Sequence, residues 1–243
     1  MKIKIIDNFL EDKDYKLLSS LTLDKAPDDA VKVYHNCIDR KNNVTKADCI
    51  SPELIKHLKE RYEKKALDLL NDLCPKKINL YEYLDLHILE TGKNLSFPIH
   101  DDGPEKLLSG VVYLRPSINK GTIFYANKKG DEKNEIEWKT NRAVFFAREE
   151  RKTWHSFEGD KKSNRLVLLY NLMTTKIREV YKTENKSFLI SQLRFPIFCN
   201  LKFLLSTKFS EEVDIARLWS CLGHLWGMSG ASLGHVCGMS GHV

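Results

Sequence analysis

Apolar and polar positions alternate with a helical period in the first third of the chain. In the stretch 51–73, apolar residues recur every three or four positions: Leu54, Leu58, Tyr62, Ala66, Leu69 and Leu73. This spacing places them on one face of a helix. Ser51 suits the N-cap and Pro52 the first turn. A short strand over 1–9 and a helix over 11–21 are expected before it, and residues 24–50 are polar and turn-rich.

Beyond Pro75 the period changes from that of a helix to that of a strand. Leu80, Leu84, Leu86 and Ile88 would lie on one face of an extended segment. Short runs rich in Val, Phe, Tyr and Leu follow, each bounded by turn signals, at 107–114, 121–126, 142–147 and 164–172. Successive short strands without intervening helices predict a mainly β fold with flanking α-helices, arranged as a sandwich or barrel.

The pattern weakens after residue 175. Helices are expected at 186–205 and 210–226, and the final residues are rich in Gly, Ser and His. The octamer GHLWGMSG at 223–230 returns as GHVCGMSG at 234–241, which is too short a repeat for a solenoid. We therefore expect 176–243 to be a C-terminal extension, partly helical and then flexible.

Composition and charge limit the class of protein but do not identify a binding partner. The 243 residues are 42% apolar and 30% charged, as in ordinary soluble proteins, and the net charge is +6. Six cysteines without a C-x-x-C pair indicate reduced thiols and make a structural zinc site improbable. Charges interrupt the N-terminus at once, so no signal peptide is expected. Arg194, Pro196 and Lys202 interrupt the apolar run at 188–205, which argues against a membrane span. We expect a cytoplasmic protein.

One set of polar residues has the composition of a metal site. His100 and Asp102 are two apart and face the same side of an extended chain, and His155 follows in TWHSFEG at the end of a later strand. Two imidazoles and one carboxylate form the ligand set of non-heme Fe(II), with coordination positions left open. Arg165, ten residues on, offers a fork for a carboxylate. Asp101 would point away, in a solvated or turn-stabilising role.

The order H-x-D, distal His, then Arg resembles the prolyl-4-hydroxylase-like branch of the 2-oxoglutarate/Fe(II)-dependent dioxygenases. The runs LLSGVVYL and KGTIFY, and the apolar strand that leads to the distal histidine, resemble the same family. The resemblance implies a dioxygenase domain over 1–175. Its core, at 78–174, would be a double-stranded β-helix (jelly-roll, cupin-like) preceded by N-terminal helices.

The resemblance also implies roles. His100, Asp102 and His155 would hold Fe(II), and Arg165 would bind the C5 carboxylate of 2-oxoglutarate. Tyr113 would donate its hydroxyl to that carboxylate, unless it is only a core aromatic residue. The family uses O2, with ascorbate as an accessory reductant. Its reaction hydroxylates an unactivated C–H bond and releases succinate and CO2. Related halogenases lack the carboxylate, so Asp102 favours hydroxylation.

The substrate is open at this stage. A protein side chain, such as a prolyl residue, and a small molecule both fit, and the approach to the first histidine departs from the family. One alternative is a catalytically inactive β-barrel binding module of the same fold. Another is a nucleic-acid or membrane-associated protein that uses its basic surface and 188–205. The lysine runs NKKGDEK and EGDKKSNR include acids, so a nucleic-acid partner is not expected. The oligomeric state is not indicated.

Overall fold

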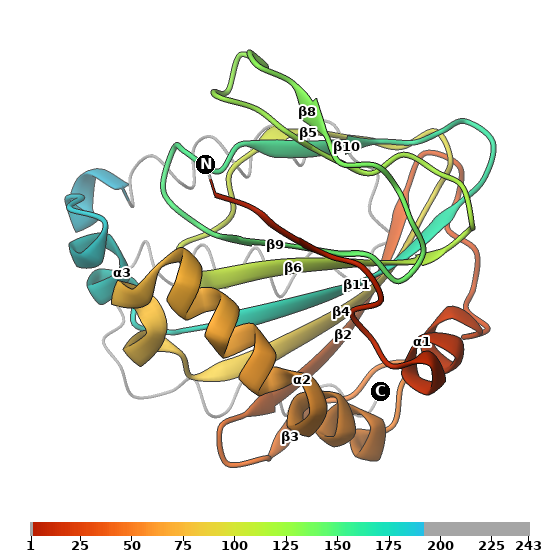
Figure 1. Cartoon of the computed structure of the whole chain (residues 1–243), viewed down its shortest axis with the longest axis horizontal. Coiled ribbons are helices and arrows are strands. Elements are labelled where there is room, and N and C mark those ends of the chain that lie inside the picture. The colour runs from red at the N-terminus through yellow and green to blue at the C-terminus, as the bar shows by residue number, and fades with distance from the viewer. Residues whose placement is uncertain (1, 192–243) are drawn as a thin grey trace, which may run out of the picture.

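The computed structural model describes residues 2–191, which form two antiparallel sheets and several helices. The larger sheet has seven strands, in the order β1 (Lys4–Ile6), β9 (Ala143–Ala147), β6 (Lys106–Arg115), β11 (Arg165–Met173), β4 (Tyr83–Thr91), β2 (Val31–Asp39) and β3 (Val44–Lys46). The smaller has four, in the order β5 (Ser96–His100), β10 (His155–Glu158), β7 (Thr122–Phe124) and β8 (Asn134–Glu135). Figure 1 shows the smaller sheet at the top of the view, above the larger one. The expectation of a mainly β fold is confirmed.

The two faces of the larger sheet carry different cores. The side chains of Leu84, Leu86 and Ile88 on β4 are fully buried in the outer core, together with residues of α2 (Pro52–Leu73). The alternate residues of the central strands of the larger sheet point to its other face, toward the smaller sheet. They join an inner core around Tyr113, Phe124, Trp138, Phe146 and Val167. The strand period of two seen in the sequence therefore separates a helix-covered face from an inner face.

The helices before the sheet core largely follow the pattern of the sequence. Helix α1 spans Asp12–Ser19, and in α2 the side chain of Ser51 accepts a hydrogen bond from the backbone N–H of Leu54 (3.2 Å), as an N-cap does. The buried face of α2 is rotated slightly from the predicted stripe. Ile55 and Leu70 are buried, whereas Leu54 and Leu73 are only half-buried.

Residues 24–50 contain more regular structure than expected, because they form β2 and β3. Strand β2 pairs with β4 along its whole length, from Val31 opposite Thr91 to Asp39 opposite Tyr83. The sequence hid this strand because His35 and Cys37, on its inner side, break the alternation of apolar and polar residues.

The described part of the chain ends with helical turns. A 3-10 helix, η1 (Pro75–Leu80), leads into β4, and α3 (Ile177–Thr183) buries Val180 and Tyr181 against the rest of the molecule. Among residues 2–191, none of the helices is long and apolar enough to cross a membrane. The predicted helix at 210–226, most of that at 186–205 and the repeat-containing tail lie outside the described residues.

Candidate metal centre

Two short strands and the turn after one of them bring the predicted triad together. His100 ends β5 and His155 begins β10, and the register of the two antiparallel strands places them directly opposite each other. Asp102 follows His100 by two residues. One ligand atom from each of the three lies within 4.8 Å of the other two, and no other group of three such residues is found in 2–191. Sequence spacing therefore predicted this cluster correctly.

The two imidazoles are oriented by backbone carbonyls. Nδ1 of His100 lies 3.0 Å from the carbonyl oxygen of Pro98, and Nδ1 of His155 lies 2.8 Å from that of Thr153. A carbonyl oxygen only accepts, so each Nδ1 carries the hydrogen and each Nε2 keeps a lone pair. Nε2 of His155 is turned toward Asp102, at 3.9 Å from Oδ2. Fixing the second ring nitrogen in this way is how metal-bound histidines are held.

Electrostatics keep His100 and Asp102 in the protonation states that a metal requires. Burial, together with the charge of His155, lowers the pKa of His100 to about 3, so its imidazole is neutral near pH 7. Burial raises the pKa of Asp102, but the positive charge of Lys106 and the two imidazoles outweigh it and hold the pKa well below its usual range. Lys106 Nζ and Ser109 Oγ donate to the Asp102 carboxylate at 2.8 Å and 2.5 Å. A neutral imidazole and an ionised carboxylate are metal ligands.

Arg165 lies on the inner face of the larger sheet, close to the triad. Its guanidinium carbon is 4.0 Å from the ring centre of Phe157, which is two residues beyond His155 on the same side of β10. Two residues of strand span roughly 7 Å. Arg165 is therefore placed to hold one end of a small molecule whose other end reaches the triad.

Arg165 also lacks an anionic partner. It is 4% exposed, donates one hydrogen bond to the carbonyl oxygen of Lys120 (3.3 Å), and its Nε has no acceptor. No ion pair joins it to a carboxylate of residues 2–191. Burial lowers its pKa to about 10, which still leaves it charged at neutral pH. A buried cation without a counter-charge is costly, so this side chain fits a site for a carboxylate ligand.

Tyr113 is fully buried beside Arg165, and its hydroxyl already has two partners. It donates to Thr122 Oγ1 (3.0 Å) and accepts from the backbone N–H of Thr122 (2.8 Å). Its ring stacks on Trp138 with 4.4 Å between ring centres. Burial raises the pKa of this hydroxyl. A role toward 2-oxoglutarate stays a prediction.

Asp101 is half-buried and stabilises a turn. Its carboxylate accepts from the backbone N–H of Arg151 (2.6 Å) and from Thr153 Oγ1 (2.5 Å). Both partners lie in the segment that leads to His155. Asp101 therefore ties the turn after β5 to the approach of β10, while its neighbour Asp102 faces the triad.

A buried ionic network behind Asp102 was not foreseen from the sequence. Arg148 Nε donates to the carbonyl oxygen of Asp102 (3.1 Å), and Arg148 Nη1 donates to both carboxylate oxygens of Glu184 (2.8 Å each). Glu184 also accepts from Lys77 Nζ (2.5 Å) and from the backbone N–H of Glu150 (3.1 Å). These residues come from four separate segments, and no spacing in the sequence signals them. The end of α3 thus supports the turn that carries a triad residue.

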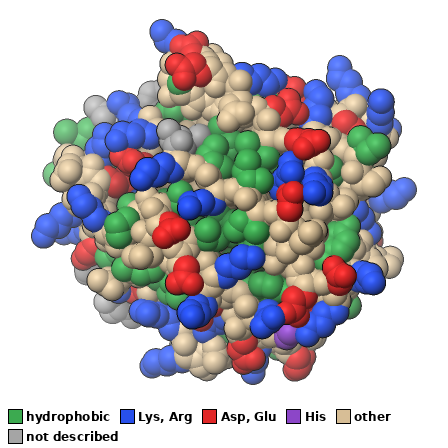
Figure 2. Space-filling model, viewed as in Figure 1, with side chains coloured by type: hydrophobic (Ala, Val, Ile, Leu, Met, Phe, Trp, Pro, Cys, Tyr) green, Lys and Arg blue, Asp and Glu red, His purple; other side chains and the backbone are tan. Residues whose placement is uncertain are grey.

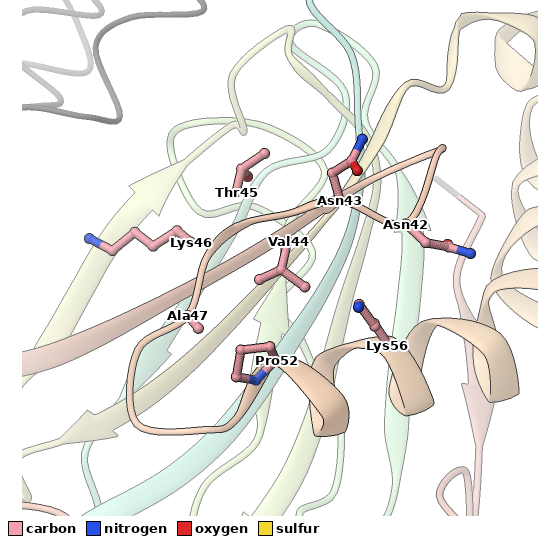
Figure 3. A pocket seen from close by; sticks show the side chains of 8 residues that line it. All are labelled: Asn42, Asn43, Val44, Thr45, Lys46, Ala47, Pro52 and Lys56. Carbon is pink, nitrogen blue, oxygen red and sulfur yellow. The ribbon is translucent and has the colours of Figure 1, made fainter.

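A surface hollow elsewhere shares no residue with the triad. It lies between the β2–β3 hairpin and the start of α2, and its mostly exposed lining is Asn42, Asn43, Val44, Thr45, Lys46, Ala47, Pro52 and Lys56 (Figure 3). On the face shown in Figure 2, Lys and Arg side chains lie among Asp and Glu.

Comparison with known proteins adds the fold. No protein-family model and no curated protein sequence matches this chain. IDO from Bacillus thuringiensis has a similar crystal structure, with 14% identity and a TM-score of 0.52 over 72% of this chain and 90% of its own. A prolyl-4-hydroxylase from Pseudomonas putida has 15% identity and a TM-score of 0.49, and the match covers 71% of this chain and 92% of the Pseudomonas chain. A 2OG-Fe(II) oxygenase family oxidoreductase from Burkholderia pseudomallei has 14% sequence identity and a TM-score of 0.45. The match covers 70% of this chain and 84% of the Burkholderia chain.

At such identities, the similarity to the Bacillus structure establishes a shared fold and leaves the activity to be argued from the site. The sequence contributes the order of motif residues, and the structure contributes the clustering of His100, Asp102 and His155 on and beside the smaller sheet, with Arg165 on the larger sheet. In the order of its motif residues the chain resembles the 2-oxoglutarate/Fe(II)-dependent dioxygenases of the prolyl-4-hydroxylase-like branch, and in fold it resembles the Bacillus structure.

Proposed function

We propose that the chain is an Fe(II)- and 2-oxoglutarate-dependent dioxygenase that hydroxylates a C–H bond and releases succinate and CO2. The observation that carries the proposal is the pairing of two sites on the facing sides of the two sheets. One is a cluster of His100, Asp102 and His155 with ligand atoms within 4.8 Å; the other is Arg165, a buried cation without a carboxylate partner among residues 2–191. Together they suit a metal and a ligand with two carboxyl ends.

The residues divide the work as follows. His100, Asp102 and His155 hold Fe(II), which, with 2-oxoglutarate and O2, supplies the oxidising chemistry when bound. Arg165 binds the distal carboxylate of 2-oxoglutarate through its fork, and the Phe157 ring beneath it keeps water away from the guanidinium. Lys106 and Ser109 hold the Asp102 carboxylate in place. Ascorbate would serve only as an accessory reductant.

The substrate class is a protein side chain or a small molecule. Prolyl-4-hydroxylases are among the similar solved structures, and a prolyl side chain is one candidate on that ground. The presence of Asp102, rather than a small residue, supports hydroxylation over halogenation.

Succinate formation tests the proposal without knowledge of the substrate. Purified protein with Fe(II), 2-oxoglutarate, ascorbate and O2 should release succinate slowly, because turnover uncoupled from hydroxylation still consumes 2-oxoglutarate. His155→Ala should abolish this release, and His57→Ala, a half-buried histidine bonded to Asp14, should not. If the wild-type protein binds Fe(II) and 2-oxoglutarate but releases no succinate, the inactive binding module is the better account.

A further inference from the structure

The inner face of the larger sheet carries a second polar group, formed by His35 and Cys37 on β2, Asp85 and His87 on β4, and Asn171 on β11. We call it the Asp85 row. The register places Cys37, Asp85 and Asn171 opposite one another on neighbouring strands, and His35 opposite His87. Figure 1 shows β2, β4, β11 and β6 side by side in this order.

The Asp85 row extends to the triad through one serine. Leu169 pairs with Val111, and Leu172 with Leu108, so the register of β11 and β6 places Asn171 beside Ser109. Ser109 Oγ in turn donates to the carboxylate of Asp102. Side chains on neighbouring strands of one face stand about 5 Å apart. The row therefore begins next to the triad and runs away from it, across β11 and β4 to β2.

Asp85 is a buried carboxylate whose neighbours among residues 2–191 are a thiol and imidazoles, with no Lys or Arg. It is 5% exposed, and its contacts are Cys37 Sγ, which donates to Oδ1 (3.3 Å), and His87 Nε2, 2.7 Å from Oδ2 but not aligned as a hydrogen bond. No Lys or Arg of residues 2–191 forms an ion pair with it. Burial raises its pKa, but the charges of His87 and His35 outweigh this and lower it to about 2. The carboxylate is therefore ionised near pH 7 and keeps lone pairs to spare.

Asn171 supplies the complementary chemistry. It is 1% exposed, and its Nδ2 has no acceptor. A buried amide N–H that donates to nothing carries a desolvation cost, which a ligand oxygen would remove. The apolar residues around the row, Leu89, Val111 and Leu169, would contact an aliphatic body.

We propose that the Asp85 row is the substrate subsite, and that it binds an amine: the cationic nitrogen contacts Asp85, and a neighbouring oxygen of the substrate accepts from Asn171. The inference rests on the proposed function, because it assigns the substrate class of that site. Residues paired across strands are close, so nitrogen and oxygen must be near each other in the ligand. His87 and His35, stacked with 3.8 Å between ring centres, form the wall behind Asp85.

Two probes that differ only in the critical atom test the subsite. L-leucinamide has a cationic nitrogen, a neighbouring carbonyl and an aliphatic body; 2-hydroxy-4-methylpentanamide replaces the nitrogen by a hydroxyl. The melting temperature of the full chain is measured with each, with and without Fe(II) and 2-oxoglutarate. We expect the amine to raise it and the hydroxy compound to raise it less.

Asp85→Asn should remove this preference and weaken amine binding by about 30-fold or more, because a buried charge partner is lost. Asp131→Asn, the same change at an exposed loop position, should leave it intact. Should Asp85→Asn fail to fold, Asn171→Leu is the second variant. It replaces an unsatisfied amide by an apolar group of similar size, so it should fold and still bind the amine more weakly.

Equal shifts with both probes, no shift with either, or equal shifts in wild type, Asp85→Asn and Asn171→Leu would each overturn the subsite. The result is separable from the proposed function, because succinate formation without added substrate does not need the Asp85 row. Loss of the amine preference with succinate release intact rejects only the subsite. Amine binding without any succinate release rejects only the enzyme.

Discussion

Residues 2–191 contain two largely buried sets of one carboxylate with two imidazoles, and within these residues only one set has the geometry of a metal site. His100, Asp102 and His155 have ligand atoms within 4.8 Å of one another. Asp85, His87 and His35 do not, although Asp85-Leu86-His87 has the same spacing as His100-Asp101-Asp102, in reverse order.

Position in the fold explains the difference. Asp85 and His87 lie inside a strand, where residues on one face stand side by side and point in the same direction. Their neighbour His35 stacks its ring on that of His87 instead of converging with it on a point. His100 is the last residue of its strand and Asp102 lies in the turn that follows. This turn allows the Asp102 side chain to point toward β10, the strand that carries His155. In this fold, the motif at the strand end converges with a third residue, and the motif inside the strand does not.

The partners of the two carboxylates differ as well. Asp102 has Lys106 and Ser109, which position it, whereas among residues 2–191 the contacts of Asp85 are a thiol and imidazoles. This difference is why we propose a metal at the first carboxylate and a cationic substrate group at the second.

The largest effect is expected at Asp102. Asp102→Ala removes one of three ligands, and even residues that only support metal ligands change activity by about 10- to 100-fold. Succinate formation should fall by more than about 100-fold. Asp101→Ala, one residue away, should lower succinate formation by about tenfold, because it loosens only the segment before His155. Steady-state assays on both variants measure this, and similar losses would contradict the roles assigned to the two neighbours.

Arg165→Ala should come next, with a distinct kinetic signature. Loss of the guanidinium over Phe157 should raise the KM for 2-oxoglutarate by about 30-fold or more, and leave Fe(II) affinity unchanged. Arg165→Lys should restore only part of the affinity for 2-oxoglutarate, since an ammonium group lacks the planar fork of a guanidinium. A change in metal affinity without a change in KM would show that Arg165 supports the metal instead.

Glu184→Ala should act through stability. It leaves Arg148 and Lys77 buried without their carboxylate, and breaking such pairs costs about 3–5 kcal/mol of the free energy of unfolding. Glu179→Ala, at an exposed position of α3, should cost little. Urea unfolding of both variants is the measurement, and an unchanged midpoint for Glu184→Ala would mean that α3 does not support the body of the protein.

Asp85 should give the smallest effect, at acid pH. Its pKa in the folded protein, about 2, is below the usual 3.8, so the unfolded chain binds a proton that the folded chain does not. The stabilisation is present above pH 3.8 and is lost as the pH falls toward 2, by up to about 2 kcal/mol. Urea midpoints of wild type and Asp85→Asn between pH 5 and pH 3 should therefore converge, whereas parallel curves would contradict the shifted pKa.

The sequence predicted what depends on local pattern and missed what depends on distant partners. The period of two located β4, β6, β9 and β11, and the spacing of His100, Asp102 and His155 predicted the triad. Strand β2 was missed, since the residues of the Asp85 row occupy its inner face. The ionic network around Glu184 was invisible because its members are up to 107 positions apart.

The comparison of the two carboxylates is tested most directly by anaerobic Fe(II) titration of wild type, Asp102→Ala and Asp85→Asn, followed calorimetrically with 2-oxoglutarate present. We expect one Fe(II) per chain for wild type and for Asp85→Asn, and no measurable binding for Asp102→Ala. Fe(II) binding that survives in Asp102→Ala and disappears in Asp85→Asn would place the metal at Asp85 and contradict the proposed site.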